Sequence, residues 1–512
     1  MVAFLGGGAT AAAQALPPDF RADVIAEGFS NPVQVVFLPG GEMLVVEQGG
    51  VVWVMQDGAR LPTPFADLSD EALATGDRGL LGVAVSPDFA ATGEVVFLLT
   101  VQDPPGPGDN DYESAAWSRL VRYDADLAAG GLTIDPSTRA VLLGTDATDG
   151  IPSCSPSHSI GTVRYALDGT LFVGAGDGAD FRFVDGGQIG NPVGPTCADL
   201  FPTQNEGALR AQDLGTLAGK LLRLDPATGG GLADNPFFDG DPTSVVSRVW
   251  ALGLRNPYRF SVRPGGTGAG VVYAGDVGWD TWEEVDVAGP AGGRNFGWPC
   301  FEGDGVNGGY AADPATSGVC ATVGAAQVTA PLLTWHHDDP GTLGWTGTAA
   351  IGGVFYEGTS YPAEYLDAYF FADYTSGIMK VLQVDGGDAL LDVLDFGANL
   401  GAVVDVEAEP ASGDLVYVSI GDGNVRRIVY DNPSPPPPPP PPEGPHCACR
   451  VAGGARDAAT TPAGDAATGV AGMGTGLGVL GLLSIFLRAR VRGRRRVARP
   501  LLRAQGGRTW KS

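Results

Sequence analysis

One pattern of strands and turns recurs six times along this chain and most strongly limits its fold. Each copy has an apolar strand, a turn with Pro, Asp or Gly, a second strand, and a Gly-rich corner before a strand that carries a basic residue. The six copies span residues 31–55, 80–124, 161–226, 255–278, 349–385 and 402–430. Strands that repeat as blocks are typical of a β-propeller and not of a sandwich. The sequence therefore predicts an all-β, six-bladed β-propeller.

The composition agrees with this fold class, and the spacing of the copies indicates where ligands bind. The 512 residues include 79 Gly and 40 Pro, and only 18% are charged, which is typical of a chain rich in turns. Residues 102–117, 179–218 and 299–347 are inserts too long for ordinary hairpins. We expect them to crowd one face of the propeller, over the central channel, where propellers bind ligands.

The charge of the chain argues against a nucleic-acid partner. Ten of its 31 Lys and Arg residues lie between Arg488 and Lys511, so the preceding residues carry 21 basic against 59 acidic groups. Nucleic-acid binding needs a cationic face, because phosphate contacts supply most of its affinity.

The two ends of the chain predict an exported protein. Residues 1–15 are small and apolar and end in Ala-Gln-Ala, as in a signal-peptide remnant. After the propeller (16–431), a Pro-rich linker with a Cys motif (432–465) contains eight consecutive prolines, which form a stiff polyproline II rod. Residues 466–487 carry no charge and predict a single C-terminal hydrophobic helix that can cross a membrane, followed by a basic tail (488–512). A buried core helix is the alternative for 466–487.

The C-terminal tail also resembles a known sorting signal. The order of the CACR motif at 447–450, the apolar helix and the Arg cluster is similar to the C-terminal sorting tails of myxobacterial surface proteins. This resemblance implies a protein at the cell surface or outer membrane, with a tail that is cut near the cysteines. Before any such cut, the helix would hold the protein in the membrane.

Six cysteines suit an exported chain, in which pairing is the default. Nearest neighbours that close loops predict disulfides between Cys154 and Cys197 and between Cys300 and Cys320. A zinc site is the weaker interpretation, because the spacing of Cys and His does not support one.

The stretch from Cys154 to Asp177 holds the first histidine of the chain, His158. Two predicted strands, 162–166 and 170–175, follow this residue. His158 is therefore expected on a loop at the end of a rigid sheet, which is where propellers place their chemistry. A loop histidine tied only to the backbone is the alternative.

Several ordered motifs of the body resemble one family. These motifs are RGLLGVAVSPDF (78–89), HSIG (158–161), DGTLFVGAGD (168–177), GKLLRLDP (219–226), GLRNPYRFSV (253–262), GDVGWDTWEEVD (275–286) and RNFGWPCFEG (294–303). Together they resemble the soluble quinoprotein glucose/sorbosone dehydrogenases over about residues 20–430. The resemblance implies a six-bladed propeller that oxidises an aldose at its anomeric carbon, with pyrroloquinoline quinone (PQQ) as hydride acceptor and Ca²⁺ to polarise the quinone. It also implies a small-molecule sugar substrate and an external electron acceptor.

The resemblance assigns roles to individual residues. His158 falls on the family's catalytic base, and an imidazole suits that task at neutral pH. Arg255 and Asn256 fall on the Arg-Asn pair at the cofactor, where an arginine can stabilise charge on the quinone oxygen. Gly278 and Trp279 align with the residues whose backbone carbonyls hold Ca²⁺. For Arg255, an ion pair with a strand carboxylate is the alternative.

Other positions near these motifs depart from the family or carry weaker predictions. Asp77 stands where the family has a cofactor-binding Gln. Glu357, Thr375 and Ser376 stand where the family has cations that pair with the three carboxylates of PQQ, so the cofactor is expected to bind less well. Three acidic residues are either additional metal ligands or, more simply, solvated loop charges: Asp276, Asp280 and Glu283. Two adjacent histidines are expected in a loop that can line the pocket: His336 and His337.

Three functions therefore compete. The first is an exported PQQ- and Ca²⁺-dependent aldose dehydrogenase with His158 as general base. The second is a non-catalytic cell-surface propeller that binds a protein or glycan, because the ADYTSG form (372–377) resembles Hedgehog-interacting-type propellers. The third is a metal-dependent propeller hydrolase such as a lactonase, which needs a central cluster of carboxylate and amide ligands.

Overall fold

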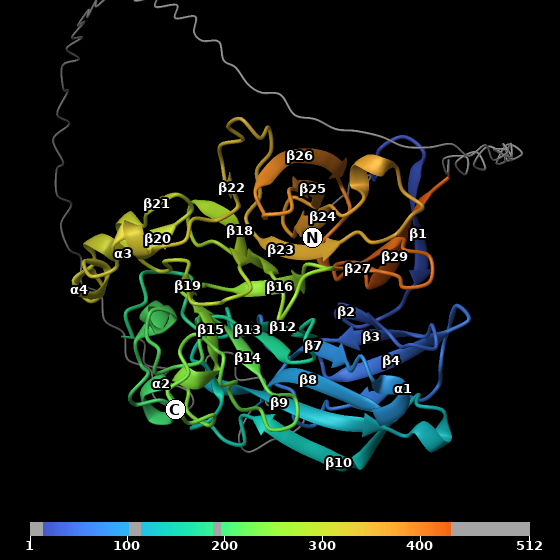
Figure 1. The fold of residues 1–512 in the computed structure, drawn as a ribbon, viewed down its shortest axis with the longest axis horizontal. Helices are drawn as coiled ribbons and strands as arrows, with labels where there is room; N and C mark the ends of the chain where they lie inside the picture. The colour runs from blue at the N-terminus through green and yellow to red at the C-terminus, as the bar shows by residue number, and fades with distance from the viewer. Residues whose placement is uncertain (1–13, 102–113, 188–195, 432–512) are drawn as a thin grey trace, which may run out of the picture. The chain divides into compact units, whose positions relative to one another are not determined.

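The computed structural model describes residues 14–101, 114–187 and 196–431, and within them it confirms a six-bladed β-propeller. Figure 1 shows the six sheets arranged around a common centre. The predicted signal remnant, apart from its last two residues, lies outside the described residues, as do the linker, the helix at 466–487 and the basic tail. No helix in the described ranges is long and apolar enough to span a membrane.

The blades follow one another along the chain, and their strands are as follows. The first contains β2 (Pro32–Phe37), β3 (Met43–Glu47), β4 (Val51–Gln56), β5 (Ala59–Arg60) and β6 (Ala66–Asp67), and the second β7 (Leu80–Val85), β8 (Glu94–Val101), β9 (Ala116–Ala125), β10 (Ile134–Leu143) and β11 (Ile151–Ser153). The third contains β12 (Ile160–Tyr165), β13 (Leu171–Ala175), β14 (Lys220–Leu224), β15 (Val249–Leu252) and β19 (Arg294–Asn295), and the fourth β16 (Pro257–Val262), β17 (Val272–Asp276), β18 (Trp282–Ala288) and β22 (Leu333–His336). The fifth contains β23 (Ala350–Phe355), β24 (Tyr369–Asp373), β25 (Ile378–Val384) and β26 (Leu390–Gly397), and the sixth β27 (Val403–Ala408), β28 (Leu415–Ser419), β29 (Asn424–Tyr430) and β1 (Phe20–Ala26).

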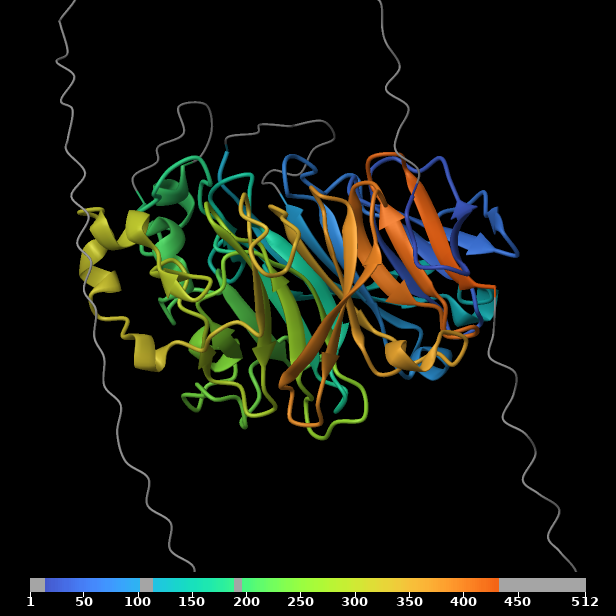
Figure 2. The same cartoon turned by 90° about the horizontal axis from the view of Figure 1, so that it is seen from above.

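The remaining elements are short and lie between the blade strands. They are α1 (Phe89–Thr92), α2 (Cys197–Leu200), the hairpin β20 (Phe301–Glu302) and β21 (Gly305–Val306), α3 (Gly308–Ala312) and α4 (Ser317–Cys320). Five 3₁₀ helices complete the described elements: η1 (Leu127–Ala129), η2 (Gly207–Ala211), η3 (Val246–Arg248), η4 (Ala325–Gln327) and η5 (Ala363–Tyr365). Figure 2 shows the yellow segment with α3 and α4 at one edge of the ring. Both predicted disulfides are present: Cys154–Cys197 links the insert at 179–218 to the segment after β11, and Cys300–Cys320 closes a loop within the insert at 299–347.

The second strands of five blades have buried residues at every position, as in β3, β13 and β28, and β8 of the second blade is buried at all but its first residue. Runs of Val, Leu, Ile and Phe form strands here because they pack on both faces of each sheet, against the neighbouring blades. A hydrophobic core therefore continues around the ring from blade to blade.

The ring closes through the pairing of β1 with β29. Phe20 lies opposite Tyr430 in this antiparallel pair, so the first strand of the chain completes the blade made by its last three strands. The Phe20 ring also meets Tyr361, Tyr365 and Phe396 of the fifth blade, with ring centroids 4.9, 5.7 and 5.1 Å away. Closure of this kind joins the two ends of the described chain in one blade, and each blade keeps only a short outer edge.

The aromatic contacts of Phe20 predict a large effect on stability. We expect Phe20→Ala to lower the free energy of unfolding by about 3 kcal/mol, because the ring fills a gap between two blades. Val24→Ala in the same strand is the control, since Val24 is 48% exposed and its loss should cost about 0.5 kcal/mol or less. Urea denaturation of both variants measures this difference, and equal effects would show that Phe20 does not help to close the ring.

The innermost strands define two mouths of the central channel. We call the end where β7, β12, β16 and β23 begin the first mouth, and the end where they finish the second mouth. A hollow of about 780 Å³ lies at the second mouth, lined by the final residues of all six inner strands and the turns after them. His158 and Arg255 instead precede β12 and β16, so they lie at the first mouth.

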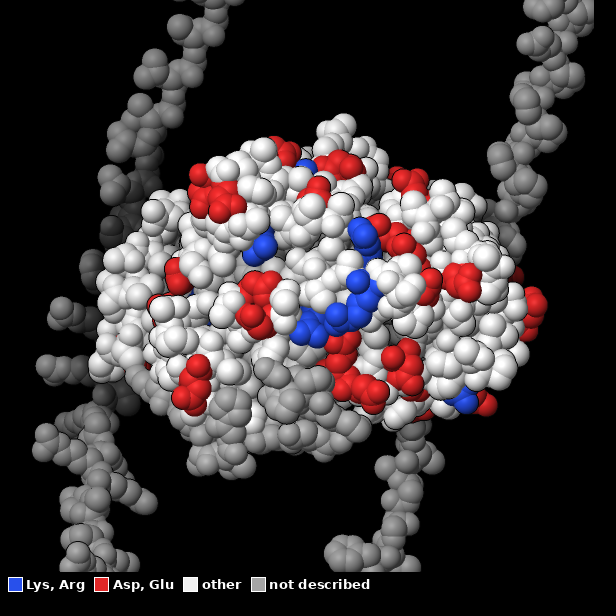
Figure 3. Space-filling model, turned by 90° about the horizontal axis from the view of Figure 1, so that it is seen from below, with Lys and Arg blue, Asp and Glu red and all other residues white. Residues whose placement is uncertain are grey.

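Acidic groups are spread over the surface of the described chain. Figure 3 shows several groups of Asp and Glu side chains on one side of the molecule, and a connected band of Lys and Arg side chains near the centre with acidic groups beside it. Arg119 and Arg139, for example, both pair with Glu71, at 2.7 and 3.0 Å. The absence of a nucleic-acid partner stays a prediction from charge.

Candidate functional site

His158 is held in one orientation at the first mouth. Its backbone is in the left-handed region (φ 53°), which is uncommon for a residue other than Gly and often marks functional loops. Its Nδ1 lies 3.0 Å from Asp177 Oδ1. Because an ionised carboxylate can only accept, Nδ1 carries the proton and Nε2 keeps a lone pair. No described residue bonds to Nε2, so this nitrogen is available to a ligand.

Asp177, directly after β13, is the fixed partner of His158. It is fully buried, and its backbone N–H donates to the Arg255 carbonyl at 2.8 Å while its own carbonyl accepts from Arg210 Nε at 2.8 Å. Burial raises the pKa of Asp177, but His158 first and then Arg255 lower this pKa by more, so it falls below the ordinary value. Asp177 is therefore an anion that can stabilise a protonated imidazole.

Trp298 connects the histidine to the arginine. Its Nε1 donates to Asp177 Oδ2 at 2.7 Å, and the Arg255 guanidinium lies over its ring, 5.3 Å from the centroid. Trp298 comes from the segment after β19, far from Asp177 in sequence. His158, Asp177, Trp298 and Arg255 thus form one buried group at the first mouth.

Arg255 and Asn256 are held through their backbone. Both of their N–H groups donate to the Asp276 carboxylate, at 2.9 and 2.6 Å, and Arg255 Nη1 donates to the Val277 carbonyl at 2.8 Å. Arg255 forms no salt bridge among the described residues, so the alternative of an ion pair with a strand carboxylate is not seen. The Asn256 side-chain amide has no hydrogen-bond partner in the described chain and is free to contact a ligand.

The loop with Gly278 and Trp279 is shaped by two buried glutamates. Glu302 Oε1 accepts N–H groups from four successive residues, 279–282, at 2.9, 2.9, 2.9 and 3.2 Å. Glu283 Oε2 accepts from Gly278 N at 3.1 Å and from Ala350 N at 2.6 Å. The N–H groups of this loop therefore point at carboxylates, as in an anion-binding nest. Within the described residues, the carbonyls of Gly278 and Trp279 accept no hydrogen bond.

The two histidines of TWHHDD have different surroundings. His337 Nε2 lies 2.8 Å from Glu283 Oε1, and although burial lowers the pKa of His337, Glu283 raises it by more, to above its ordinary value. His336 is the last residue of β22 and not a loop residue, and its Nδ1 accepts from Asp338 N and Asp339 N at 2.9 and 3.0 Å. His337 contacts Glu283, whereas the His336 ring packs against the ring of Trp282, with centroids 4.8 Å apart.

The other predicted site residues fall into two groups. Asp77 borders the site, where its Oδ2 accepts from His158 N at 3.2 Å. Thr375 and Ser376 lie at the first mouth beside a hollow of about 500 Å³, and their hydroxyls donate to Asp373 Oδ1 at 3.0 and 2.9 Å. Glu357 lines the hollow at the second mouth, because it follows the end of β23. The structure therefore does not bring Glu357 together with His158 and Arg255.

The simple interpretation of Asp276 and Glu283 as solvated loop charges is wrong, whereas Asp280 is exposed, as that interpretation expects. Asp276 and Glu283 are 4% and 0% exposed. Asp276 lies beside Glu284 and Asp286 of β18, which are 8% and 1% exposed. Burial raises the pKa of Asp276 to about 7. Burial also raises the pKa values of Glu283, Glu284 and Asp286 above their ordinary values. For Glu284 and Asp286, repulsion from the neighbouring carboxylates of the cluster raises the pKa further.

These shifts predict that the metal-free protein is more stable in mild acid. A carboxyl whose pKa is higher in the folded than in the unfolded state adds stability below the unfolded value, near 4, and this stability is lost as the pH rises through the folded value. For Asp276 that value is about 7. We expect the free energy of unfolding in EDTA to fall by about 3 kcal/mol between pH 5 and pH 7.5. Urea denaturation at several pH values measures this slope, and Asp286→Asn should flatten it. Stability that rises with pH would contradict the prediction.

Some of the groups at the first mouth fit PQQ and Ca²⁺, and others do not. The free carbonyls of Gly278 and Trp279 suit a hard cation, and Arg255 supplies a buried positive charge beside an unsatisfied Asn256 amide. The Thr375 and Ser376 hydroxyls donate their single protons to Asp373 and supply no positive charge for the carboxylates of PQQ. His158 Nε2 supplies a base in the same group.

Asp177, Trp298 and Glu302 are the site residues that sequence reasoning missed. Asp177 ends the GAGD motif and lies 19 residues after the histidine, which was a usable signal. The sequence around Trp298 and Glu302 gave no such signal, because the residues that they contact lie in other parts of the chain.

The fold and the site define a class of propeller with a His–Asp pair, an Arg–Asn pair and free carbonyls at one mouth. A model of the Glucose / Sorbosone dehydrogenase family matches residues 29–427, so the chain belongs to this family.

Individual relatives are distant. The HIPL2 protein of Arabidopsis thaliana is 26% identical over 414 residues, which cover 72% of this chain and 53% of that protein. Quinoprotein glucose dehydrogenase B of Acinetobacter calcoaceticus is 28% identical over 301 residues, which cover 58% of this chain and 56% of that protein. The chain thus spans about half the length of the curated relatives it matches.

Solved structures share the fold. The PQQ-bound aldose sugar dehydrogenase of Streptomyces coelicolor has a TM-score of 0.55 at 22% identity, covering 81% of this chain and 99% of that one. The apo-form of the soluble aldose sugar dehydrogenase of Escherichia coli has a TM-score of 0.56 at 21% identity, covering 80% and 99%.

Proposed function

We propose that this protein is a PQQ-dependent sugar dehydrogenase that oxidises an aldose at its anomeric carbon. One observation carries the proposal: a buried Asp177 orients His158 so that Nε2 is a free base at the same mouth as Arg255. Membership of the family and the relatives named above support the sugar substrate and the cofactor.

The roles follow from the chemistry of each group. When bound with Ca²⁺, PQQ supplies a hydride acceptor. His158 Nε2 takes the proton of the anomeric hydroxyl as hydride leaves the carbon, and Asp177 stabilises the imidazolium that forms. Arg255 would stabilise negative charge on the cofactor, and the carbonyls of Gly278 and Trp279 would hold Ca²⁺. Repeated turnover would need an external electron acceptor.

The location of the protein is part of the same proposal. The leader at 1–15, the two disulfides and the sorting-type tail support an exported protein at the cell surface or outer membrane. Measuring the mass of the mature protein tests whether the leader and the tail are removed.

Reconstitution tests the enzyme. The purified protein is incubated with PQQ and CaCl₂ and assayed by dye reduction with a panel of aldoses. We expect PQQ-dependent turnover of at least one aldose. Binding of PQQ without turnover of any aldose, with the fold intact, would contradict the proposal.

A second function is favoured by one observation. Thr375 and Ser376 replace cations at the first mouth, and the HIPL2 protein is among the relatives. A non-catalytic propeller that binds a protein or glycan would show no change in PQQ absorbance at micromolar cofactor. That result would contradict the dehydrogenase function and favour the binding function.

A further inference from the structure

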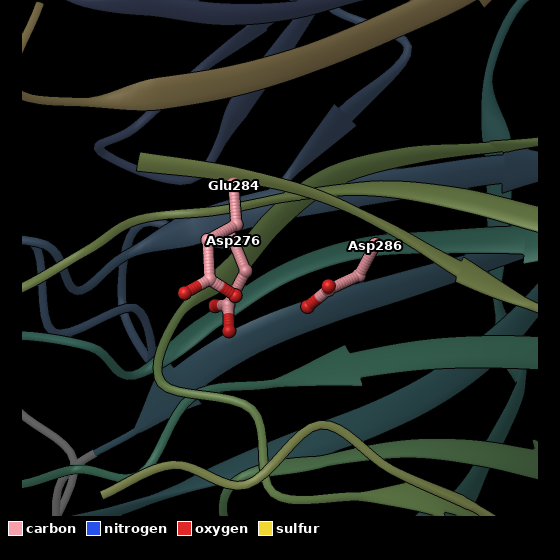
Figure 4. Close-up of side chains that lie close together, drawn as sticks. All are labelled: Asp276, Glu284 and Asp286. Atoms are coloured by element: carbon pink, nitrogen blue, oxygen red, sulfur yellow. The ribbon is translucent and has the colours of Figure 1, made fainter. Parts of the chain in front are cut away.

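Three acidic side chains meet in the interior of the fourth blade, behind the first mouth. Asp276 is the last residue of β17, and Glu284 and Asp286 lie two residues apart on the same face of β18. Asp276 pairs with Glu284 in the strand register, and Ala274 pairs with Asp286. One oxygen from each of the three carboxylates lies within 4.8 Å of the other two. Figure 4 shows all three carboxyl groups turned toward one another.

Asp286 is the unusual member of the cluster. Asp276 accepts backbone N–H groups from Arg255 and Asn256, and Glu284 accepts one from Gly303. Asp286 is 1% exposed, yet neither of its oxygens has a hydrogen-bond partner, and no described cation pairs with it. A buried carboxyl without any partner costs several kcal/mol, so its position indicates a group that the protein chain itself does not supply.

The space beside Asp286 is small and apolar. A cavity of about 10 Å³ adjoins this carboxyl and is otherwise lined by apolar side chains, among them Leu254, Pro257 and Phe296, and not by Asp276 or Glu284. A volume of that order is about one water-sized sphere.

We propose that Asp276, Glu284 and Asp286 bind one Ca²⁺ ion. Three carboxylates form an all-oxygen ligand set, which hard cations prefer and which lacks the N and S donors typical of zinc. Three bidentate carboxylates can supply six oxygens, which suits the flexible coordination of Ca²⁺, whereas Mg²⁺ usually keeps several waters, for which this buried site has little room.

This ion would be separate from the one at the Gly278 and Trp279 carbonyls, and the proposal does not depend on the proposed function. Binding of this ion would nevertheless affect the first mouth. Asp276 also holds the N–H groups of Arg255 and Asn256, so the ion would fix the segment that carries this pair.

Calcium binding without PQQ or sugar tests the proposal. The purified full-length protein is stripped with EDTA, transferred to chelator-free buffer and titrated with CaCl₂ by calorimetry, and its Tm is measured with and without CaCl₂. We expect one site of micromolar affinity or tighter and a rise in Tm of about 5 °C in excess calcium. Asp286→Asn keeps the side-chain shape and should weaken binding at least 100-fold. Asp280→Asn, at an exposed position of the nearby loop, should leave binding unchanged.

Two outcomes would contradict the proposed calcium site. No calorimetric binding by the unmodified protein, or equal affinity of the unmodified and Asp286→Asn proteins, would overturn it. If Asp286→Asn does not fold, Glu284→Gln takes its place with the same expectations. The Tm of each variant in EDTA shows that it is folded, and we expect this Tm to equal or exceed that of the unmodified protein, because one buried charge is gone.

Discussion

Replacing His158 by Ala should lower kcat of the PQQ-reconstituted protein toward its aldose by about 1000-fold, the usual contribution of a positioned general base. The reason lies in the geometry of the first mouth. Asp177 fixes the imidazole with Nε2 free, so the variant loses the only oriented base of the described site. Dye reduction at saturating aldose and PQQ measures the loss.

Two further variants separate catalysis from structure. Asp177→Asn should also lower kcat strongly, because an amide can donate to Nδ1 and favour the wrong tautomer. His336→Ala should leave kcat unchanged, because His336 interacts with Asp338 and Asp339 and not with this group. A His158→Ala protein that binds PQQ and keeps full kcat would rule out the general-base role.

Replacing Glu302 by Ala should raise the apparent dissociation constant of PQQ by about 100-fold. Glu302 Oε1 collects four backbone N–H groups of residues 279–282, and its loss leaves these donors without an acceptor. The resulting penalty of about 3 kcal/mol falls on the loop whose carbonyls at Gly278 and Trp279 would hold Ca²⁺. Titration of PQQ at fixed calcium, followed by absorbance, gives the constant.

Glu302→Gln is the matched control for this role. Glutamine keeps one oxygen acceptor in nearly the same place, so it should restore most of the PQQ affinity that Ala loses. Equal loss in both variants would mean that the charge of Glu302, and not its hydrogen bonds, supports the loop. Unchanged PQQ affinity in the Ala variant would contradict the role entirely.

The propeller fold could be predicted from the sequence because the pattern that indicates it is local. A blade is a run of neighbouring strands and tight turns, so the six copies are visible as a repeat from residue 31 to residue 430. The pairing of Cys154 with Cys197 and of Cys300 with Cys320 was predictable for the same reason, since each joins neighbours in sequence. The roles of His158, Arg255, Gly278 and Trp279 stay predictions, although the structure places all four at the first mouth.

Burial is where sequence reasoning failed. Asp276 and Glu283 read as loop charges because they stand among Gly and Trp residues, yet the strand register turns both into the interior. Glu357 aligns with a family cation by its place in a motif, but a residue just beyond the end of an inner strand lies at the mouth opposite His158.

The sequence alone determined the number of blades, the family and the histidine around which the first mouth is built, because each of these is written in contiguous residues. Only the tertiary structure decided that Asp177, Trp298 and Arg255 meet at that histidine, that Glu302 shapes the loop at 279–282, and that Asp286 is buried without a partner. The physical reason is that closing the ring brings together segments far apart in the chain, and the hydrogen bonds and burial that this creates have no local signature.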